Sequence, residues 1–405
     1  MTANAAPLSA ATALQVMVEL QGVTKRYGEV EALQRIDLSV RKGEFVTLLG
    51  PSGSGKSTLL NLIAGMIAPS SGRIIIDGRD ATTLPTNRRG IGMVFQNYAL
   101  MPHMTVFENI AFPLQVRRLP KDEIRRKVEQ ALDLIQLRHV AQRRPRELSG
   151  GQQQRISLAR CIVYNPALIL MDEPLGALDK KLREQMQLEI KQLHRKLGMS
   201  VIYVTHDQEE ALTMSDRIAV FNNGRIEQIG VASELYEEPA TRFVANFIGE
   251  TNLFPGTVIS VSDGFCLIAT SQLRLRARHR SEIKPGQTIL VGVRPERMLL
   301  FDPKSLTENM ENVVTGEVSE LIYLGKARKY VIRVVDTQIT ALQQITDSGR
   351  ATFNIGDVVA VHWNAMDAVT IADSAPSLTA SNFATAPEAR GSLLSDCGAL
   401  ERPSR

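Results

Sequence analysis

The spacing of apolar residues changes along this chain and divides it into two structured parts. From Val16 to about residue 250, short apolar runs typical of strands alternate with stretches whose apolar residues recur at helical spacing. After about Gly249, only short strand patterns follow. The alternating part predicts an α/β core on a largely parallel sheet, and the second part predicts an all-β domain of barrel type.

Individual elements are expected between turn residues. Helical character dominates from about 97 to 160, where Asp122 is the expected N-cap of one helix; a later helix is expected to end at Gly198. The apolar faces of these two helices are Ile124, Val128, Leu132 and Ile135, and Leu182, Met186, Ile190, Leu193 and Leu197. The expected strands are 16–20, 32–40, 44–49, 72–78, 91–95, 167–171, 200–205, 256–261, 265–270, 288–293, 316–323, 330–335 and 358–363.

Length and composition set the domain boundaries. At 405 residues the chain is expected to hold two or three domains. The α/β domain is expected at 16–250, with its helical subdomain at about 97–160, and the β-barrel domain at 251–372. Residues 1–15 are expected to be flexible, and the Ala/Ser/Pro-rich residues 373–405 to form a disordered tail.

The balance of charges and the cysteine pattern narrow the class of protein. The 47 basic and 43 acidic residues give a net charge of +4, too even to indicate nucleic acid or an anionic membrane as partner. No stretch approaches roughly 18 uninterrupted apolar residues, and the N-terminus lacks the basic start of a signal peptide. Cys161, Cys266 and Cys397 are scattered, which favours a reducing compartment and no metal cluster. These features predict a cytosolic protein.

The clearest chemical motif is the run from Gly50 to Ser57, which reads G-x-x-x-x-G-K-S. It lies between an expected strand and an expected helix, the context that a phosphate-binding loop requires. Glycines let backbone N–H groups turn inward, and the helix adds its positive end, so that a triphosphate is cradled. Lys56 would reach the β- and γ-phosphates, and the Ser57 hydroxyl would ligate Mg²⁺. The phosphate-binding candidates are Gly50, Pro51, Ser52, Gly53, Ser54, Gly55, Lys56, Ser57 and Thr58.

Further candidates follow other strands. Asp172 ends the apolar run that begins at Leu168 and can hold Mg²⁺ at the carboxyl edge of the sheet, and Glu173 can polarise an attacking water. The amide of Gln96 could reach Mg²⁺ or the water, and His206 could contact the γ-phosphate. Standing alone, these two are also explained as an exposed glutamine and a structural histidine. The candidate metal ligands are Ser57, Gln96 and Asp172, and the candidate catalytic residues are Glu173, His206 and Gln96.

A second anion-binding device is expected at Leu148-Ser149-Gly150-Gly151-Gln152, where a serine and two glycines begin a helix. Taken alone, this run is also explained as a flexible turn. Combined with the single phosphate loop, it suggests composite sites in a two-fold dimer, in which each protomer closes the site of the other.

In this order the motifs resemble those of the ATP-binding cassette (ABC) ATPases of membrane transporters, over roughly residues 16–250. The matching motifs are an aromatic loop at Tyr27, Walker A at 50–57, the Q-loop at Gln96, the signature at 148–152, Walker B at 168–172, the catalytic Glu173, the D-loop at 176–179 and the switch histidine His206. The resemblance implies a P-loop NTPase fold that binds ATP and Mg²⁺. It also implies roles for residues outside the phosphate loop. Tyr27 would stack on adenine, Ser149 and the glycines after it would act on the γ-phosphate of the partner's ATP, and Asp179 would couple the two sites. Cys161 stands where a smaller residue is more usual, and we expect it to affect packing only.

The all-β part resembles the OB-like C-terminal barrel, of the TOBE type, found in bacterial solute-importer ATPases. The sequence of residues 99–109, 205–217 and 247–252 resembles that of the polyamine (spermidine/putrescine) importer ATPases. Importers of sugars, ferric iron, sulfate or molybdate have very similar sequences in these segments. They remain alternatives, because other subunits determine which solute is transported. The resemblance thus implies the ATP-hydrolysing subunit of a bacterial importer.

The partners implied by this resemblance are a second ATPase subunit, expected as a homodimer, two membrane permease subunits, and, indirectly, a periplasmic solute-binding protein. The implied location is the cytoplasmic face of the inner membrane, as a peripheral subunit. The helical subdomain would dock on the permease through an apolar patch, although the same residues could instead belong to its core. The patch residues are Met101, Pro102, His103, Met104 and Phe107.

The pattern of the barrel is also compatible with two other functions. Arg274, Arg276, Arg278 and Arg280 alternate on one expected strand, which would suit a soluble ATPase linked to nucleic acid. Because no aromatic residues interleave for stacking, a solvated strand face also explains them, and no nucleic-acid partner is expected. The barrel could also be a sensor that binds the solute or a regulator, which is compatible with transport.

Overall fold

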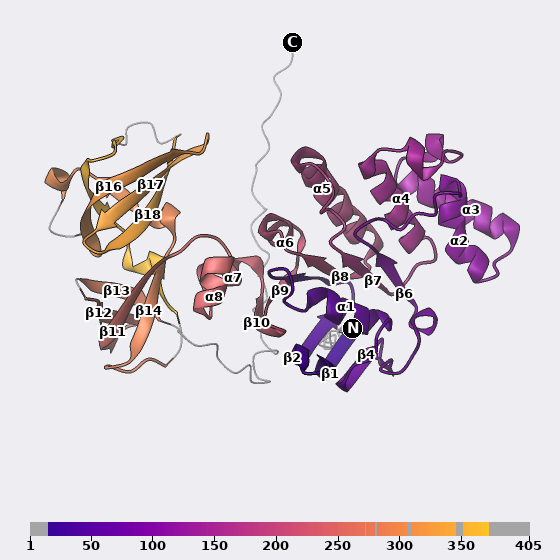
Figure 1. Cartoon of the computed structure of the whole chain (residues 1–405), viewed down its shortest axis with the longest axis horizontal. Coiled ribbons are helices and arrows are strands. Elements are labelled where there is room, and N and C mark those ends of the chain that lie inside the picture. Colours follow the sequence, from indigo (N-terminus) through magenta and orange to yellow (C-terminus); the bar gives the residue numbers. More distant parts are fainter. Residues whose placement is uncertain (1–14, 272, 280–281, 307–309, 346–350, 372–405) are drawn as a thin grey trace, which may run out of the picture. The chain divides into compact units, whose positions relative to one another are not determined.

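The computed structural model describes residues 15–271, 273–279, 282–306, 310–345 and 351–371. The expected flexible N-terminus, apart from residue 15, and the expected disordered tail lie outside these ranges. Figure 1 shows the α/β part and the β-rich part as separate sets of elements along the chain.

A six-stranded sheet forms the centre of the α/β part (Figure 1). Its strand order is β10 (Arg225–Gly230), β9 (Arg217–Asn222), β3 (Phe45–Leu49), β8 (Ser200–Thr205), β7 (Leu168–Asp172) and β6 (Ile91–Val94). All pairs are parallel except β10 with β9. Every residue of β3 and β8 is buried, as expected for central parallel strands covered on both faces. The predicted α/β core is confirmed.

A second, antiparallel sheet packs near the first helix. Its order is β2 (Val30–Arg41), β1 (Val16–Tyr27), β4 (Ser71–Ile76) and β5 (Arg79–Asp80). The helix α1 (Lys56–Ala64) follows β3, and its Leu59 and Leu60 share one apolar core with Leu20 of β1 and Leu48 of β3. The apolar contact joins α1 to both sheets, and this packing fixes the start of the helix.

The helical subdomain consists of α2 (Val106–Val116), α3 (Lys121–Leu134) and α4 (Gly150–Ile162), which have an apolar core of their own. The predicted N-cap at Asp122 was wrong, because the helix begins at Lys121 with Pro120 in the cap position. Asp122 lies in the first turn instead, where a carboxylate also interacts favourably with the positive end of the helix. A proline tolerates this boundary since it has no N–H to leave unsatisfied.

Four helices complete the α/β part. They are α5 (Lys180–Leu197), α6 (Gln208–Met214), α7 (Ala232–Glu237) and α8 (Arg242–Phe247). As predicted, α5 ends at Gly198, whose φ of 60° is left-handed and suits glycine. Met186 and Ile190 are buried, whereas Leu197 on the predicted apolar face is 43% exposed in the last turn. Among the described residues, no helix combines the length and the apolar composition needed to cross a bilayer.

The β-rich part contains the predicted barrel and, in addition, a second sheet. The closed barrel is formed by β11 (Asn252–Ser262), β12 (Phe265–Ala269), β13 (Arg274–Arg278), β20 (Ala368–Ile371) and β14 (Thr288–Val293). The sheet has the order β15 (Leu299–Phe301), β19 (Val358–His362), β16 (Val313–Tyr323), β17 (Ala327–Val334) and β18 (Thr337–Gln344). Barrel and sheet share one apolar core, in which the fully buried Trp363 stacks on Phe254 of β11 at 5.4 Å between ring centroids.

Arg89 is a buried cation that holds the end of α1. Its side chain is 7% exposed and donates to the carbonyls of Leu62 and Ile63 at 2.7 and 2.8 Å, and to Leu84 at 2.8 Å. Burial lowers the pKa of this guanidinium. The last carbonyls of a helix have no partner within the helix, and they form the negative end of its dipole. The positive charge of Arg89 is therefore favourable at the end of α1.

Replacing Arg89 with methionine is expected to lower the free energy of unfolding by about 2–4 kcal/mol, because buried carbonyls lose their donors. Urea unfolding followed by circular dichroism would measure the change. Arg88→Met, at the exposed neighbouring position, is the control and should unfold like the wild type. An Arg89→Met protein as stable as the control would contradict this role.

Candidate nucleotide-binding and catalytic site

The phosphate loop leaves the carboxyl end of β3 and enters α1 with the conformation that the motif requires. Gly53 and Gly55 have φ values of 79° and 102°, which are left-handed and strained for other residues. A Cβ on Gly50 would lie 2.4 Å from the carbonyl oxygen of Phe221, and one on Gly55 would lie 2.7 Å from Leu33. The loop is therefore packed against β9 and β2 with no room for side chains at these two glycines.

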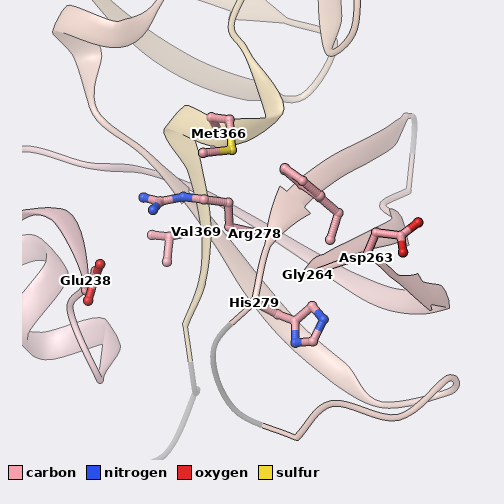
Figure 2. A pocket seen from close by; sticks show the side chains of 8 residues that line it. Glu238, Asp263, Gly264, Arg278, His279, Met366 and Val369 are labelled. Carbon is pink, nitrogen blue, oxygen red and sulfur yellow. The ribbon is translucent and has the colours of Figure 1, made fainter.

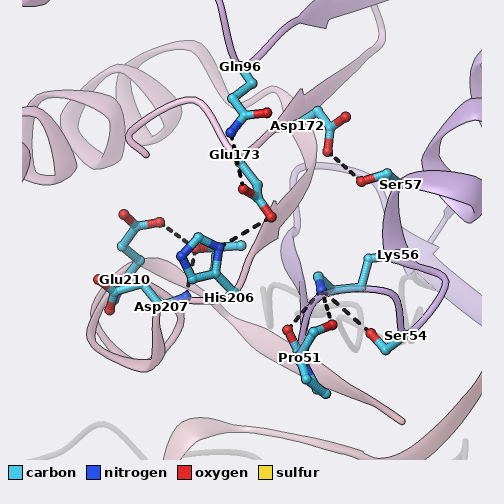
Figure 3. A network of polar contacts seen from close by, with 12 residues as sticks. Pro51, Ser54, Lys56, Ser57, Gln96, Asp172, Glu173, His206, Asp207 and Glu210 are labelled. Atoms are coloured by element: carbon cyan, nitrogen blue, oxygen red, sulfur yellow. Dashed lines mark hydrogen bonds and ion pairs between the residues drawn. The ribbon is translucent and has the colours of Figure 1, made fainter. Parts of the chain in front are cut away.

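Lys56 points back into the loop. Its side chain is 4% exposed, and Nζ donates to the carbonyls of Gly50 and Pro51 at 2.8 Å each (Figure 3). Burial lowers the pKa of Lys56, and the carboxylates Glu173 and Asp172 oppose that shift. The ammonium thus lies within the curve of the loop, where phosphate oxygens are expected to bind.

The phosphate loop meets the end of β7 through one hydrogen bond. Ser57 Oγ, in the first turn of α1, donates to Oδ1 of Asp172 at 3.0 Å (Figure 3). Burial raises the pKa of Asp172, and the bond from Ser57 opposes this shift. The two side chains that were predicted to hold Mg²⁺ therefore lie side by side.

These oxygen donors fit Mg²⁺. Hydroxyl and carboxylate oxygens are its preferred protein ligands, and it commonly keeps several waters and phosphate oxygens as its other ligands. Ser57 and Asp172 would supply the protein ligands. Gln96, the third predicted ligand, lies against Glu173, with Nε2 at 3.5 Å from Oε2, and its role as a metal ligand stays a prediction. No group of three or more His, Cys, Asp or Glu side chains within the described ranges could hold a metal by itself.

Glu173 lies between Gln96 and His206, as Figure 3 shows. Its Oε1 is 3.3 Å from Nδ1 of His206, and its Oε2 is 3.5 Å from Nε2 of Gln96. The backbone of Glu173 is left-handed, with a φ of 42°, and its N–H donates to the carbonyl of Val204 at 3.0 Å. This strained turn directs the carboxylate away from the path of β7 and toward the neighbouring strand ends.

The register of the central sheet explains this meeting. Asp172 pairs with Val204 on β8, and Leu49 pairs with Thr205, so that β3, β7 and β8 end at the same edge. Side chains that follow these ends therefore converge at the edge where parallel sheets bind ligands. The site unites three predicted catalytic residues with Lys56, Ser57 and Asp172.

The signature run lies elsewhere in the chain. Ser149 is the N-cap of α4 and is exposed; its Oγ accepts the N–H of Gln152, whose side chain accepts the N–H of Ser149. A Cβ on Gly150 would contact Leu178 of the D-loop, and one on Gly151 would lie 3.0 Å from Leu182 of α5. The signature thus packs beside the D-loop of its own chain, and its helix N-terminus faces solvent.

Two other predicted site residues have simple surroundings. Asp179 is the N-cap of α5, and its carboxylate accepts the N–H of Leu182 at 3.0 Å. Tyr27 ends β1, is 51% exposed and has the ammonium of Lys25 4.9 Å from its ring centroid. Its strand partner β2 reaches the phosphate loop, since Ala32 lies against Gly55. The roles of Tyr27 and Asp179 stay predictions.

A polar network behind His206 was not predicted. Asp207 caps α6, and its carboxylate pairs with Nη1 of Arg183 at 3.0 Å. The same guanidinium donates to the carbonyl of Leu178 in the D-loop at 3.0 Å. The sequence signal was available, because Asp207 and Glu210 have the Asp-x-x-Glu spacing of a helix start directly after a strand.

Glu210 forms the buried end of this network. It is 3% exposed and accepts hydroxyl protons from Tyr203 at 2.8 Å and Thr205 at 2.7 Å. Burial raises the pKa of Glu210, and these two bonds oppose the shift. The network fixes the turn that presents His206.

The predicted apolar patch on the helical subdomain is divided. Pro102 and His103 are exposed, whereas Met101, Met104 and Phe107 are half-buried. Phe107 packs against the core of the subdomain. The core interpretation thus holds for Phe107, and the docking role of the exposed residues stays a prediction.

The arginines of β13 lie on one face of the strand. Arg274 and Arg276 are exposed and alternate with the buried Leu275 and Ala277. Arg276 pairs with Glu311 at 2.6 Å. A neighbouring acid thus offsets one of these charges, which supports the solvated-face interpretation; Arg280 lies outside the described residues.

A pocket of about 250 Å³ opens beside β13 (Figure 2). Its lining residues are Glu238, Asp263, Gly264, Phe265, Arg278, His279, Met366 and Val369. Pockets for drug-sized ligands usually exceed roughly 300 Å³. The pocket is small and mixes acidic and basic groups, so the lining favours no single ligand class, and the sensor function stays a prediction.

Comparison with known proteins agrees with this geometry. Residues 33–176 match the family described as ABC transporter, and residues 291–371 match the TOBE domain. The structure of cbiO1 from Clostridium perfringens, part of the ABC transporter complex cbiONQ, superposes with a TM-score of 0.52 at 29% identity, covering 55% of this chain and 92% of that chain.

Relatives extend over most of the chain. The spermidine/putrescine import ATP-binding protein PotA of Rubrobacter xylanophilus is 47% identical, over 86% of this chain and 92% of the relative. The proteins of the same name from Nitrosomonas europaea and Thermotoga maritima are 44% and 43% identical, over 86% and 78% of this chain and 97% and 86% of theirs. The chain therefore belongs to the ABC transporter family, as an ATP-binding, ATP-hydrolysing subunit whose cassette is followed by a TOBE domain.

Proposed function

We propose that this chain drives the import of polyamines, spermidine or putrescine, through a bacterial membrane permease. The observation that carries this proposal is the similarity to spermidine/putrescine import proteins across both the cassette and the TOBE domain. In this proposal the chain works as a peripheral subunit at the cytoplasmic face of the inner membrane, and a periplasmic solute-binding protein delivers the polyamine from the other side.

The working unit in this proposal is a homodimer with two ATP molecules at the interface. Support comes from the exposed Ser149 at the N-terminus of α4, because an exposed helix N-terminus is suited to bind anions. A two-fold arrangement would place this terminus opposite the phosphate loop of the partner subunit. Asp179, beside the signature of its own chain, would then lie at the same interface.

Hydrolysis would proceed at the edge of the central sheet. Glu173 would accept a proton from the attacking water or orient it, and Gln96 and His206 hold that carboxylate in place. Lys56 would offset the charge that develops on the γ-phosphate. Bound Mg²⁺, held by Ser57 and Asp172, would supply further neutralisation of phosphate charge. Loss of the γ-phosphate would then reopen the dimer.

The solute can be tested in the reconstituted complex of this chain with its permease subunits. ATPase activity would be measured with binding proteins loaded with spermidine, putrescine, maltose, ferric iron or sulfate. Stimulation by the polyamine-loaded protein alone is the expected result. Stimulation by another solute and not by a polyamine would replace this proposal with the corresponding importer.

The exposed residues of the segment after Gln96 are expected to contact the permease. The double substitution Pro102→Asp and His103→Asp places two charges on this surface and should reduce permease-stimulated ATPase activity at least about tenfold, since unpaired charges at an apolar interface are costly. The unstimulated activity should not change, because both side chains are exposed and away from the catalytic carboxylate.

Val116→Asp provides the control for this test, because Val116 is 64% exposed on the same helical subdomain. Full stimulation is expected for the control. Full stimulation of the double variant would place the permease contact elsewhere.

A further inference from the structure

The turn that follows Gln96 is strained. Tyr98 and Ala99 have φ values of 59° and 46°, left-handed for two consecutive residues other than glycine. The turn is tight, with the N–H of Ala99 donating to the carbonyl of Asn97 at 2.6 Å. Such a conformation persists only where the surroundings hold it, and strained turns of this kind gather at functional segments.

Helix α4 supplies the groups that hold the turn. Arg160 donates from Nη1 to the carbonyl of Ala99 at 2.7 Å and from Nη2 to the carbonyl of Tyr98 at 2.9 Å. Ser157 Oγ donates to the carbonyl of Tyr98 at 2.9 Å. A planar guanidinium that bonds to two successive carbonyls fixes both their distance and their direction.

The charged guanidinium of Arg160 interacts with the carbonyl oxygens of this turn. Within the described part of the chain, no carboxylate forms an ion pair with it, so the carbonyl oxygens are the acceptors that the structure records. Burial lowers the pKa of Arg160. A further bond ties the segment just after α4 to the other end of β6, because Tyr164 donates its hydroxyl proton to the carbonyl of Ile91 at 2.8 Å. The strand that leads to Gln96 is thus held by the residues that directly follow α4.

The opposite end of α4 is the signature. Ser149 caps the helix, and Arg160 lies in its last turn. The helix has 13 residues and is therefore about 20 Å long. A displacement of its N-terminus, where the partner's γ-phosphate is proposed to bind, would be carried along a rigid helix to the turn after Gln96.

The segment beyond the turn is held from the other side. Asn109 of α2 is fully buried; its Oδ1 accepts the N–H of Met101 at 2.8 Å, and its Nδ2 donates to the carbonyls of Met101, Met104 and Thr105. The exposed Pro102 and His103 lie between these two attachments. The segment therefore has a fixed connection to α4 at its start and to α2 at its end.

We propose that Arg160 is a positioning residue that transmits displacement of the signature helix to Gln96 and to the permease-facing segment. This inference rests on the proposed function for its link to the permease. Its structural half, the hold of Arg160 on the turn, does not depend on that function. The two halves can therefore be tested separately.

The first test is hydrogen exchange on the full-length wild-type protein and the Arg160→Gln variant. Peptides that cover residues 95–101 should exchange about ten times faster in the variant, because hydrogen bonds from a charged group are lost. Arg126→Gln, at an exposed position of α3, is the matched control and should exchange like the wild type. Unchanged exchange of this segment in Arg160→Gln would overturn the hold itself.

The second test measures ATPase activity with and without the permease complex. Arg160→Gln should keep the wild-type KM for ATP and its basal rate within about twofold, while the stimulation by the loaded complex falls about tenfold. Arg160→Lys, which keeps the charge but not the planar fork, should recover only part of the stimulation. Full stimulation, or a loss of ATP affinity that accounts for the defect, would overturn the transmitting role.

A double-mutant cycle with Gln96→Ala addresses the route. If Arg160 acts through Gln96, the two substitutions together should reduce stimulated activity no more than Gln96→Ala alone. Additive losses would show that Arg160 acts by another route. If Gln96→Ala has wild-type stimulated activity, the proposed role of Gln96 is wrong. The hold of Arg160 on the turn is then decided by the hydrogen-exchange measurement alone.

If Arg160→Gln fails to fold, Ser157→Ala provides the same tests at smaller amplitude, since it removes one of the three bonds to the turn. Faster exchange at 95–101 with reduced stimulation would support the proposal. Wild-type behaviour in both measurements would count against it.

Discussion

Replacing Glu173 with glutamine is expected to lower ATP turnover about a thousandfold, which is within the usual contribution of a general base. The amide has nearly the same shape as the carboxylate, but it cannot accept the proton of the attacking water. The contacts to His206 and Gln96, at 3.3 and 3.5 Å from the carboxylate oxygens, allow an amide in the same place. ATP should therefore bind with wild-type affinity, and the ATP-bound dimer should accumulate.

Steady-state phosphate release, nucleotide binding and size-exclusion chromatography with and without ATP would measure these three effects. Glu209→Gln is a suitable control, because Glu209 is an exposed acid on α6, next to the polar network that supports His206. It should retain turnover and show no ATP-dependent dimer accumulation beyond the wild type. Turnover at the wild-type rate in Glu173→Gln would reject the assignment of Glu173 as the base.

Replacing Lys56 with alanine is expected to weaken ATP binding by about a hundredfold, since it removes a charged donor that two phosphate groups would share. The loss should appear in binding as well as in turnover, unlike the Glu173→Gln variant. Lys56 lies within the loop and is only 4% exposed. Among the described residues of the loop, 50–57, no other side chain is basic, so none can replace its charge.

Titration with a fluorescent ATP analogue would measure the affinity of Lys56→Ala. Lys42→Ala removes a lysine that is exposed and pairs with Asp77 away from the loop, and it should bind as the wild type does. Thermal unfolding without nucleotide would show whether the loop remains folded once the carbonyls of Gly50 and Pro51 lose their donor. Undiminished affinity in a folded Lys56→Ala protein would contradict the proposed contact with phosphate.

The α/β core could be predicted because its central strands are nearly continuous apolar runs that end in chemically distinctive residues. Leu168–Asp172 is one example, in which four buried residues precede the carboxylate. Parallel pairing then brings the strand ends together, so the meeting of Ser57 with Asp172 followed from spacing and topology. The position of Gln96 against Glu173 did not follow, because the strained backbone of Glu173 redirects its side chain.

The second sheet of the β-rich part was harder to predict. Strand β18 reads Thr-Gln-Ile-Thr-Ala-Leu-Gln-Gln, in which polar residues dominate, and β15 has only three residues. Short or polar strands are defined by their partners more than by their own sequence. The network that joins Arg183, Asp207 and Leu178 could be predicted only in part. The spacing of Asp207 and Glu210 marks the start of a helix, but a charged residue such as Arg183 gives no sequence signal of a distant carbonyl partner.

Trp363 gives the molecule a built-in optical reporter. It is the single tryptophan of the chain, and it is fully buried against Phe254 in the core that the barrel and the second sheet share. Emission excited at the red edge of protein absorption therefore comes from the TOBE region, and the nucleotide-binding cassette contributes nothing to it. A red shift of this emission during denaturation would mark the opening of the C-terminal core, while circular dichroism of the helices would follow the cassette. The two domains can thus be observed separately in the unlabelled, full-length protein.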